Sequence, residues 1–296
     1  MARRANALWR VLLNVRDAAS AEAAARALDP AVESVSAFAA DSDWQVEGLA
    51  REKPDRAAIE ANLALQWRDG GAAPFVVIER LAERDWLGEN QKSFGPIATG
   101  RYFIHPTGWR GRVPAGRIGL GIDAATAFGT GEHGSTRGCL VALDRLARRR
   151  RFRRVLDMGC GTGILAMAAA RTWRHPVAAC DIDPEAVRVA RRNVAANGLG
   201  RFIAPRLAHS YGERALRRRG HCDLVLANIL ARPLIVMARD LGRALTPEGV
   251  AVLGGFLPWQ EAAVLAAHRA RRFTLCRRIV IDGWSTLIVS RSKFPA

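Results

Sequence analysis

A turn with glycine at every second position lies near the middle of the chain and carries its clearest chemical signal. The segment 155–158 is apolar apart from Asp157, and the turn after it contains Gly159, Gly161 and Gly163. An alanine-rich segment, 164–170, follows and is expected to be helical. Strand, glycine turn and helix form the first unit of a parallel α/β sheet that binds a nucleotide-like ligand. We expect the three glycines, in order, to let the chain leave the strand sharply, let a ligand approach the backbone, and let the helix pack closely on the sheet.

The turn is compatible with two classes of ligand, and the acid before the first glycine favours one of them. The spacing Gly161-x-Gly163-x-x-Ala166 fits the dinucleotide fingerprint, in which a helix N-terminus faces a pyrophosphate. Asp157 lies two residues before Gly159, where its carboxylate would repel a phosphate and attract a cation. The whole pattern resembles the first motif of class I methyltransferases, whose ligand S-adenosylmethionine carries a sulfonium and an ammonium group. A tight turn without a ligand is the structural alternative.

A second carboxylate, Asp181, ends the next apolar segment, 177–181. It follows Gly163 by 18 positions (163 to 181), close to the offset of about 20 residues at which an acid binds ribose hydroxyls. A carboxylate accepts two hydrogen bonds from a cis-diol, so we assign Asp181 to the ligand. Asp183 and Pro184 have the residue types of a helix N-cap and first helical position, so we assign Asp183 to capping.

The chain is strongly basic, and 49% of its residues are hydrophobic. Its 296 residues are enough for two domains. A net charge of +17 favours a polyanionic partner such as RNA, whereas the near absence of lysine among the basic residues indicates compositional bias instead. Five cysteines without a CxxC pair predict free thiols in a reducing cytoplasm and no metal site. No apolar window is long enough to predict a membrane span.

The expected elements divide the chain into two α/β domains joined by a linker helix. Residues 1–80 show the order β-α-β-β-α-β of a ferredoxin-like α+β domain. Its expected strands and helices are 8–15, 20–28 (capped by Ser20), 32–38, 44–49, 55–67 and 75–78. Residues 81–94 are expected to form the linker helix, and residues 95–296 the larger domain around the glycine turn.

The larger domain is expected to be a parallel sheet closed by a hairpin. Two expected strands, 102–104 and 118–122, precede this sheet. The expected strands that follow are 155–158, 177–181, 202–207, 222–228, 249–254, 274–282 and 284–290, and the expected helices are 137–148, 164–170, 185–196, 233–245 and 259–270. The last two strands meet at Gly283, which is too short a joint for a crossover helix, so they must be antiparallel. A parallel sheet that ends in such a hairpin is the Rossmann-like form that class I methyltransferases take.

Three motifs, in this order, resemble those of the ribosomal protein L11 methyltransferase family of the PrmA type. They are Phe128-Gly-Thr-Gly-x-His133-x-x-Thr136, the turn that follows Asp157, and Asn228-Ile229-Leu230-Ala231. The similarity extends from about Trp86 to the C-terminus, and the first domain agrees in layout. The resemblance implies a cytoplasmic enzyme that moves methyl groups from S-adenosylmethionine to lysine ε-amines and the N-terminal α-amine of a large-subunit ribosomal protein. It also implies that the first domain captures that protein, near ribosomal RNA.

Carried over motif by motif, the resemblance implies cofactor contacts at four positions: Thr136, Gly159, Asp181 and Asn228. With the residues argued above, the predicted cofactor-binding set is Thr136, Asp157, Gly159, Gly161, Gly163, Asp181 and Asn228. The loop before Thr136 departs from the family's usual residues at Glu132, Gly134 and Ser135. We expect His133 in that loop to brace it rather than to act as a base.

Methyl transfer from a sulfonium to an amine needs a neutral amine in line with the methyl group, and no metal or nucleophilic side chain. A lysine has an ordinary pKa of about 10.4, so a dry apolar pocket that disfavours its charge assists the reaction. Asn228 is expected to position the amine, and the sequence identifies no general base. Methyltransferases of DNA bases or glutamine carry Asn-Pro-Pro-Tyr at this position, and its absence favours a flexible alkyl amine. An NAD(P)-dependent oxidoreductase and a non-catalytic RNA-binding protein on a methyltransferase scaffold are the alternatives.

Overall fold

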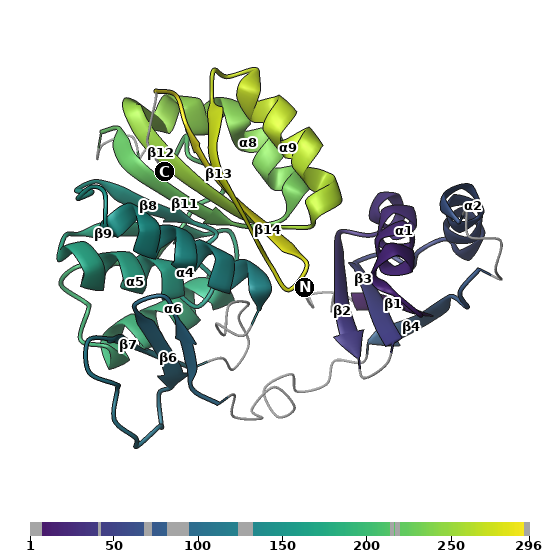
Figure 1. Ribbon diagram of the computed structural model, residues 1–296, viewed down its shortest axis with the longest axis horizontal. Coiled ribbons are helices and arrows are strands. Elements are labelled where there is room, and N and C mark those ends of the chain that lie inside the picture. The colour runs from purple at the N-terminus through teal and green to yellow at the C-terminus, as the bar shows by residue number, and fades with distance from the viewer. Residues whose placement is uncertain are drawn as a thin grey trace, which may run out of the picture. The chain divides into compact units, whose positions relative to one another are not determined.

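The computed structural model describes residues 8–40, 43–67, 73–81, 95–123, 133–213, 216 and 220–292. The chain divides into two compact units, Met1–Asp85 and Trp86–Ala296 (Figure 1). The expected linker helix, 81–94, lies outside the described residues apart from Leu81, which ends a strand. Within the described ranges, no helix is long and apolar enough to cross a membrane.

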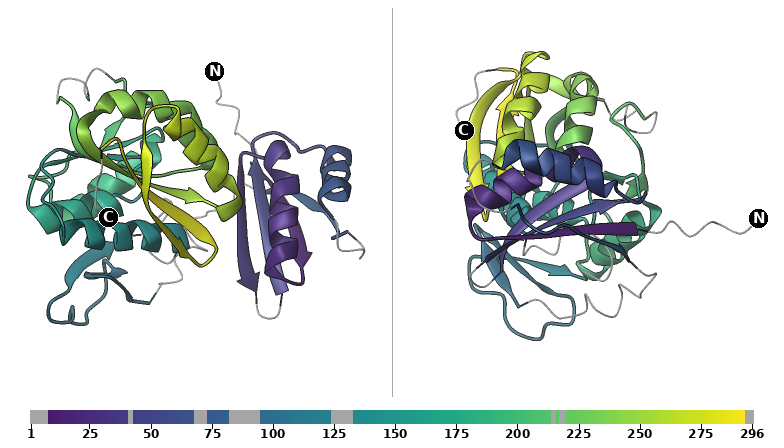
Figure 2. Two further views of the ribbon diagram at one scale, coloured as in Figure 1. Left: turned by 45° about the horizontal axis from the view of Figure 1, so that its top comes forward. Right: turned by 90° about the vertical axis from the view of Figure 1, so that its right-hand side faces the viewer.

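The first unit is a four-stranded antiparallel sheet with two helices on one face (Figure 2). Its elements are β1 (Leu8–Val15), α1 (Ala18–Leu28), the 3-10 turn η1 (Asp29–Ala31), β2 (Ser34–Ala40), β3 (Asp43–Ala50), α2 (Arg56–Gln66) and β4 (Val77–Leu81). The strand order β2-β3-β1-β4 confirms the ferredoxin-like prediction. Val11 and Val46 on the sheet and Leu28, Ile59 and Leu63 on the helices form its buried centre.

Two details of this unit differ from the sequence-based expectation. Asp17, not Ser20, caps α1, because its carboxylate accepts a hydrogen bond from the Ser20 backbone N–H at 2.8 Å. The last strand is Val77–Leu81 rather than 75–78, and its last residue, Leu81, pairs with Leu8 at the start of β1. The strand bounds differ because pairing with β1, and not residue type alone, sets where β4 begins and ends.

The second unit is built on a seven-stranded sheet with the order β10-β9-β8-β11-β12-β14-β13. Its strands are β8 (Val155–Met158), β9 (Val177–Asp181), β10 (Arg206–Leu207), β11 (Cys222–Asn228), β12 (Leu245–Phe256), β13 (Thr274–Ile281) and β14 (Trp284–Ser290). The first five strands in this order, from β10 through β9, β8 and β11 to β12, pair in parallel with their neighbours. Strand β14 pairs antiparallel with both β12 and β13. Asp282 and Gly283 turn the final hairpin with φ values of 48° and 73°, so the antiparallel prediction is confirmed.

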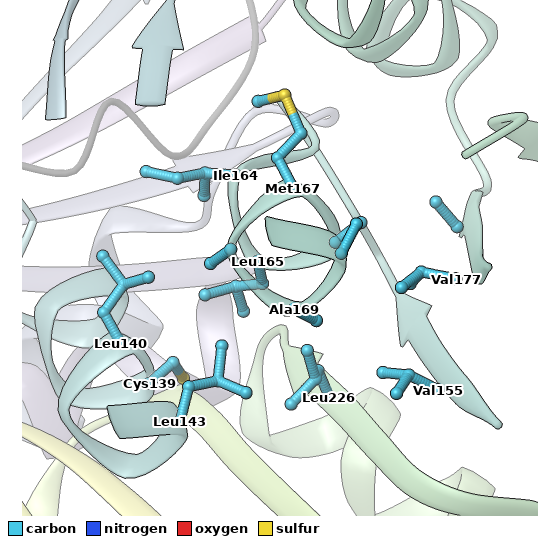
Figure 3. Packing of buried hydrophobic residues seen from close by; sticks show 14 of the residues in the cluster. Cys139, Leu140, Leu143, Val155, Ile164, Leu165, Met167, Ala169, Val177 and Leu226 are labelled. Atoms are coloured by element: carbon cyan, nitrogen blue, oxygen red, sulfur yellow. The ribbon is translucent and has the colours of Figure 1, made fainter. Parts of the chain in front are cut away.

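Helices cover both faces of this sheet and bury two apolar layers. They are α4 (Gly134–Ala147), α5 (Ile164–Trp173) and α6 (Pro184–Ala196) on one face, and α8 (Ala231–Ala244), η2 (Pro258–Gln260) and α9 (Glu261–Arg269) on the other. Successive strand residues point to opposite faces, so Val155 and Leu226 join the first layer whereas Leu156 and Val225 join the second. Figure 3 shows the first layer, where side chains from α4 and α5 pack against β8, β9 and β11.

Three expected elements of this unit have different bounds. Only Arg206 and Leu207 of the expected strand 202–207 pair as β10, and Ile203 makes an isolated bridge to Val177. The helix expected from residue 137 starts at Gly134, and the one expected from Pro233 starts at Ala231. Segments 102–104 and 118–122, which were expected to precede the large sheet, are strands of a separate sheet of β5 (Ile97–Thr99), β6 (Tyr102–Pro106) and β7 (Ile118–Ile122).

Two asparagines, Asn193 on α6 and Asn197 directly after its end, join this small sheet to the region of the glycine turn. The Asn193 side chain accepts a hydrogen bond from the Asp123 N–H at 2.8 Å and donates to the Thr162 carbonyl oxygen at 2.9 Å. Asn197, one helical turn later, accepts from the Gly121 N–H at 2.9 Å and donates to the Gly121 carbonyl oxygen at 2.7 Å. The pair replaces the neighbouring strand that the edge of β7 lacks, and it anchors the glycine turn from behind.

We expect Asn193→Ala to lower the free energy of unfolding by about 1–3 kcal/mol, because it leaves buried backbone groups of Thr162 and Asp123 without this partner. Chemical denaturation followed by circular dichroism measures the change. Arg192→Ala, an exposed neighbour on α6, is the control and is expected to change stability by less than about 0.5 kcal/mol. Equal effects of the two substitutions would contradict the anchoring role.

Candidate functional site

The glycine turn joins β8 to α5 at the carboxyl edge of the large sheet. Gly159, Gly161 and Gly163 have φ values of 72°, 52° and 82°, a region that favours glycine. The N–H groups of Gly159 and Cys160 both donate to the Cys180 carbonyl oxygen, at 2.8 and 2.9 Å. The turn is therefore tied to the end of β9 through its backbone.

The structure adds a second reason for glycine at position 159 and changes the reason at position 163. A Cβ atom at Gly159 would lie 2.2 Å from Cγ2 of Ile229, so the residue makes room for the chain after β11. A Cβ atom at Gly163 would lie 3.4 Å from Ala190 on α6, which is an ordinary contact. The backbone conformation of Gly163, and not close packing of α5 on the sheet, therefore requires glycine.

Asp157 is 1% exposed and lies beneath the turn. Its Oδ2 atom accepts a hydrogen bond from the Ala166 N–H at 2.9 Å, and its Oδ1 atom has no partner within the described ranges. Burial raises the pKa of this carboxyl from 3.8 to about 7, and the nearby charge of Asp181 adds to the rise. A buried carboxylate oxygen without a partner is a site at which a cationic ligand group would be stabilised.

Tyr211 is a neighbour of Asp157 that the sequence did not indicate. Its side chain is 4% exposed, and its hydroxyl has no hydrogen-bond partner within the part of the chain that the structure describes. Burial raises the pKa of the Tyr211 hydroxyl, and the charge of Asp157 raises it further. The phenol is thus a neutral donor close to the Asp157 carboxylate.

The Asp181 carboxylate is 8% exposed and is fixed by the turn on one side and by the start of α6 on the other. Its Oδ2 atom accepts from the Gly161 N–H at 2.8 Å, and its Oδ1 atom accepts from the Asp183 N–H at 3.0 Å. Each oxygen retains a second lone pair, so the carboxylate can still bind a diol. The next residue, Ile182, is 62% exposed and offers an apolar surface beside it. Asp183 accepts from the Glu185 N–H, which confirms its capping role.

Asn228 and Thr136 meet on the other side of β8. Asn228 ends β11 and donates from Nδ2 to Oγ1 of Thr136, at 3.3 Å, in the first turn of α4. The Asn228 Oδ1 atom is buried and has no partner within the described ranges. Gly254, opposite Asn228 on β12, leaves the room for it, since a Cβ atom there would lie 3.1 Å from Oδ1. The paired glycines at 254 and 255 were the sequence signal for this close approach.

The final hairpin packs on the start of α4. The His133 ring lies 4.2 Å from the Trp284 ring, and its Nδ1 atom is 2.9 Å from the Ser135 hydroxyl oxygen. Burial lowers the pKa of His133, and Asp282 opposes that shift. A Cβ atom at Gly134 would lie 2.4 Å from the Ile281 carbonyl oxygen, so the departure from the usual family residue coincides with a close approach of the hairpin. These contacts are consistent with the bracing role expected for His133, whereas Glu132 lies outside the described residues.

The topology brings all seven predicted site residues to one edge of the sheet. Strand β8 lies between β9 and β11, so Asp157, Asp181 and Asn228 end neighbouring strands. The Ile229 side chain packs closely against Gly159, so the residue that follows Asn228 lies directly beside the glycine turn. An edge with two carboxylates, a neutral amide and a glycine turn suits a ligand with a diol and a positive charge.

Asp157 also makes a pH prediction. Its raised pKa means that the folded, ligand-free chain keeps a proton between about pH 4 and 7 that the unfolded chain has lost. Stability therefore falls as pH rises through this window, by at most about 1.4 kcal/mol per pH unit from this group. We expect Asp157→Asn to remove that fall, measured by urea unfolding at several pH values, and Asp183→Asn to keep it. An unchanged pH dependence in Asp157→Asn would contradict the assignment.

Comparison with known proteins gives one family. The family model described as ribosomal protein L11 methyltransferase (PrmA) matches residues 10–292. A ribosomal protein L11 methyltransferase of Caulobacter sp. (strain K31) is 40% identical over 281 residues, which cover 92% of this chain and 94% of that protein. The enzyme of the same name from Rhodopseudomonas palustris (strain BisB5) is 40% identical over 252 residues, 85% of each chain.

A solved structure supports the same relationship. The ribosomal protein L11 methylase of Lactobacillus delbrueckii subsp. bulgaricus matches with a TM-score of 0.61 and 27% identity, over 68% of this chain and all of that one. Together with the sheet order and the motif positions, these matches show that the chain belongs to the ribosomal protein L11 methyltransferase (PrmA) family and is an S-adenosylmethionine-dependent methyltransferase.

Proposed function

We propose that this methyltransferase acts in the cytoplasm on ribosomal protein L11, at lysine ε-amines and the N-terminal α-amine. The observation that carries the proposal is the carboxyl edge of the sheet, where the buried Asp157 oxygen without a partner lies beside the glycine turn. The names of the relatives support the substrate. Family membership removes the oxidoreductase alternative, and the intact turn, acids and amide argue against a scaffold that has lost its activity.

The residues at the edge fit S-adenosylmethionine in a definite arrangement. Asp181 would accept the two ribose hydroxyls on the lone pairs that the backbone does not use. Asp157 would face the methionyl ammonium with Oδ1, and this cation would hold the carboxylate ionised at neutral pH. The exposed side chain of Ile182 would contact the flat face of the base. Gly161 presents backbone without a side chain to the ligand.

The cofactor supplies an activated methyl group on a sulfonium, and the protein supplies position and a dry environment. The Oδ1 atom of Asn228 is an acceptor without a partner at the end of β11, so it would orient an incoming amine through one N–H. The Nδ2 atom is occupied by Thr136, which fixes the amide orientation so that the oxygen is the atom presented. His133 lies against Trp284 and Ser135 and serves the structure. Loss of the amine proton would then depend on burial of the amine rather than on an identified side-chain base.

The first unit is proposed to capture the substrate. It has its own buried centre, and all seven proposed cofactor residues lie in the second unit. The segment 81–94 is proposed as the linker. One methyl-donor site could then serve several amines presented by a movable module.

We expect Asp181→Ala to weaken S-adenosylmethionine binding at least tenfold, because each charge-assisted hydrogen bond contributes about 1.5–3 kcal/mol. Isothermal titration calorimetry measures the affinity. Asp183→Ala, which removes only the cap of α6, is the matched control and should bind within severalfold of the unchanged protein. Equal losses in the two variants would remove Asp181 from the ligand site.

The substrate proposal is tested with labelled S-adenosylmethionine and purified ribosomal protein L11, followed by peptide mapping of the modified amines. We expect the full chain to label lysines and the N-terminus, and a chain without residues 1–81 to bind the cofactor but label L11 poorly. Full activity of the shortened chain would overturn the capture role of the first unit. Absence of labelling by the full chain, with cofactor binding intact, would overturn the substrate assignment.

A further inference from the structure

A hollow lined by arginines lies on the second unit, away from the glycine turn. Its volume is about 510 Å³, and its walls come from β7, the last turn of α5 and the segment 198–202. Four of its described lining residues are arginines, namely Arg117, Arg171, Arg174 and Arg201, and none is a carboxylate. In the described part of the chain, none of the four forms an ion pair. The hollow therefore has the chemistry of an anion site.

Contacts with neutral groups hold three of these side chains and leave charge available. Arg171 donates from Nη2 to the Asn197 carbonyl oxygen at 2.8 Å, and Arg117 donates from Nη1 to the carbonyl oxygen of Gly100. The guanidinium of Arg201 lies 4.6 Å from the centre of the Phe202 ring. A guanidinium has five N–H donors, so most donors of each group remain free for an anion.

A second hollow continues the basic surface on the other side of the segment 198–206. Its volume is about 590 Å³, and Arg191 and Arg206 are among its lining residues. Arg191 donates from Nε to the Pro205 carbonyl oxygen at 3.1 Å. The two hollows thus line a surface with six arginines, which is longer than a single phosphate group needs.

An aromatic cluster adjoins the first hollow. The half-exposed rings of Phe103, His105 and Trp109 lie together, with 5.1 Å between the centres of the Phe103 and Trp109 rings and 4.9 Å between those of His105 and Trp109. Gly119 lines the hollow, and a Cβ atom there would lie 3.6 Å from Nε2 of His105. Arginine beside accessible aromatic rings is the combination that binds phosphates and stacks unpaired bases.

The first hollow lies at the edge of the sheet opposite to the cofactor site, whereas Arg206 of the second hollow pairs with Cys180, next to Asp181. Gly163 and Asp183 are the N-cap residues of α5 and α6 at the carboxyl edge. Arg174 and Asn197 follow the C-terminal ends of the same two helices, and ten helical residues span about 15 Å. A ligand in the first hollow therefore does not compete with a ligand at the glycine turn.

We propose that this surface binds RNA that contains unpaired nucleotides. Phosphates occupy the arginine-lined hollows, and a base stacks on the cluster of Phe103, His105 and Trp109. An acidic protein segment would use the arginines but has no group for the aromatic cluster, so the arrangement favours RNA. The proposal does not depend on the identity of the methylated amine.

The test measures binding of a fluorescent single-stranded RNA of about 16 nucleotides by anisotropy, at several salt concentrations. The variant replaces three arginines that line the first hollow: Arg117→Gln, Arg174→Gln and Arg201→Gln. Arg171 is kept, because its side chain donates to the Asn197 carbonyl oxygen at the end of α6. We expect at least tenfold weaker binding, and a salt dependence whose slope is smaller by about two to three. The control makes the same change in net charge at exposed arginines of α8 and α9 and the turn after α9: Arg239→Gln, Arg269→Gln and Arg271→Gln.

Each outcome decides for or against the surface. Retained RNA affinity in the control, with unchanged S-adenosylmethionine binding and thermal unfolding in both variants, supports it. Ultraviolet crosslinks that map to 103–119, 171–174 or 198–206 support it independently. Equal losses in the two variants would show that bulk charge alone attracts RNA and would overturn it. Displacement of the RNA by polyglutamate at equal charge concentration would identify an acidic-protein surface and would also overturn it.

Discussion

The backbone junction between the glycine turn and the end of β9 is the constraint on which the site depends. One carbonyl oxygen, that of Cys180, accepts hydrogen bonds from two successive N–H groups of the turn, and the next residue, Asp181, accepts a third from Gly161. These three bonds require the left-handed backbone of the turn, since only then do successive N–H groups point toward the neighbouring strand. The position of the Asp181 carboxylate therefore depends on the shape of the turn.

A side chain of α6 and a backbone N–H of α5 then hold this junction in place. Asn193 fixes the carbonyl oxygen of Thr162 within the turn, and Ala166 fixes one oxygen of Asp157 below it. Neither contact supplies a group to the ligand. Two other polar atoms of the site, Oδ1 of Asp157 and Oδ1 of Asn228, are buried and have no partner among the described residues. Buried atoms of this kind cost stability in the free protein, and a ligand that satisfies them recovers that cost as binding energy.

The sequence was most informative where local and tertiary signals agree. Strands β9 and β11 have the predicted bounds, because each is a short apolar run that ends in a polar residue at the carboxyl edge. The predicted bounds of β10 were mostly wrong, because the apolar side chains of Phe202 and Ile203 pack in the core and their backbone is not part of that strand. The start of α4 was misplaced because Gly134 and Ser135 have turn-like residue types, whereas the approaching hairpin determines the conformation there. Tyr211 and the asparagines of α6 lie far from the motifs in sequence, so no local pattern could have placed them in the site.

Acidic and basic side chains are concentrated at different edges of the large sheet, a distribution that composition alone could not reveal. Every β-to-α turn of the large sheet lies at the carboxyl edge, where Asp157 and Asp181 create a site suited to a cation. The α-to-β turns lie at the opposite edge, where the exposed Arg174 and Arg201 follow helix C-termini whose partial negative charge tolerates cations. The alternation of strands and helices in a parallel sheet thus places acidic and basic groups at opposite edges. This separation allows one small domain to present an acidic edge to a methyl donor and its target amines while a basic edge remains available to a polyanion. Because the two edges share helices α5 and α6 but no side chains, each can be altered by mutation while the other is kept intact.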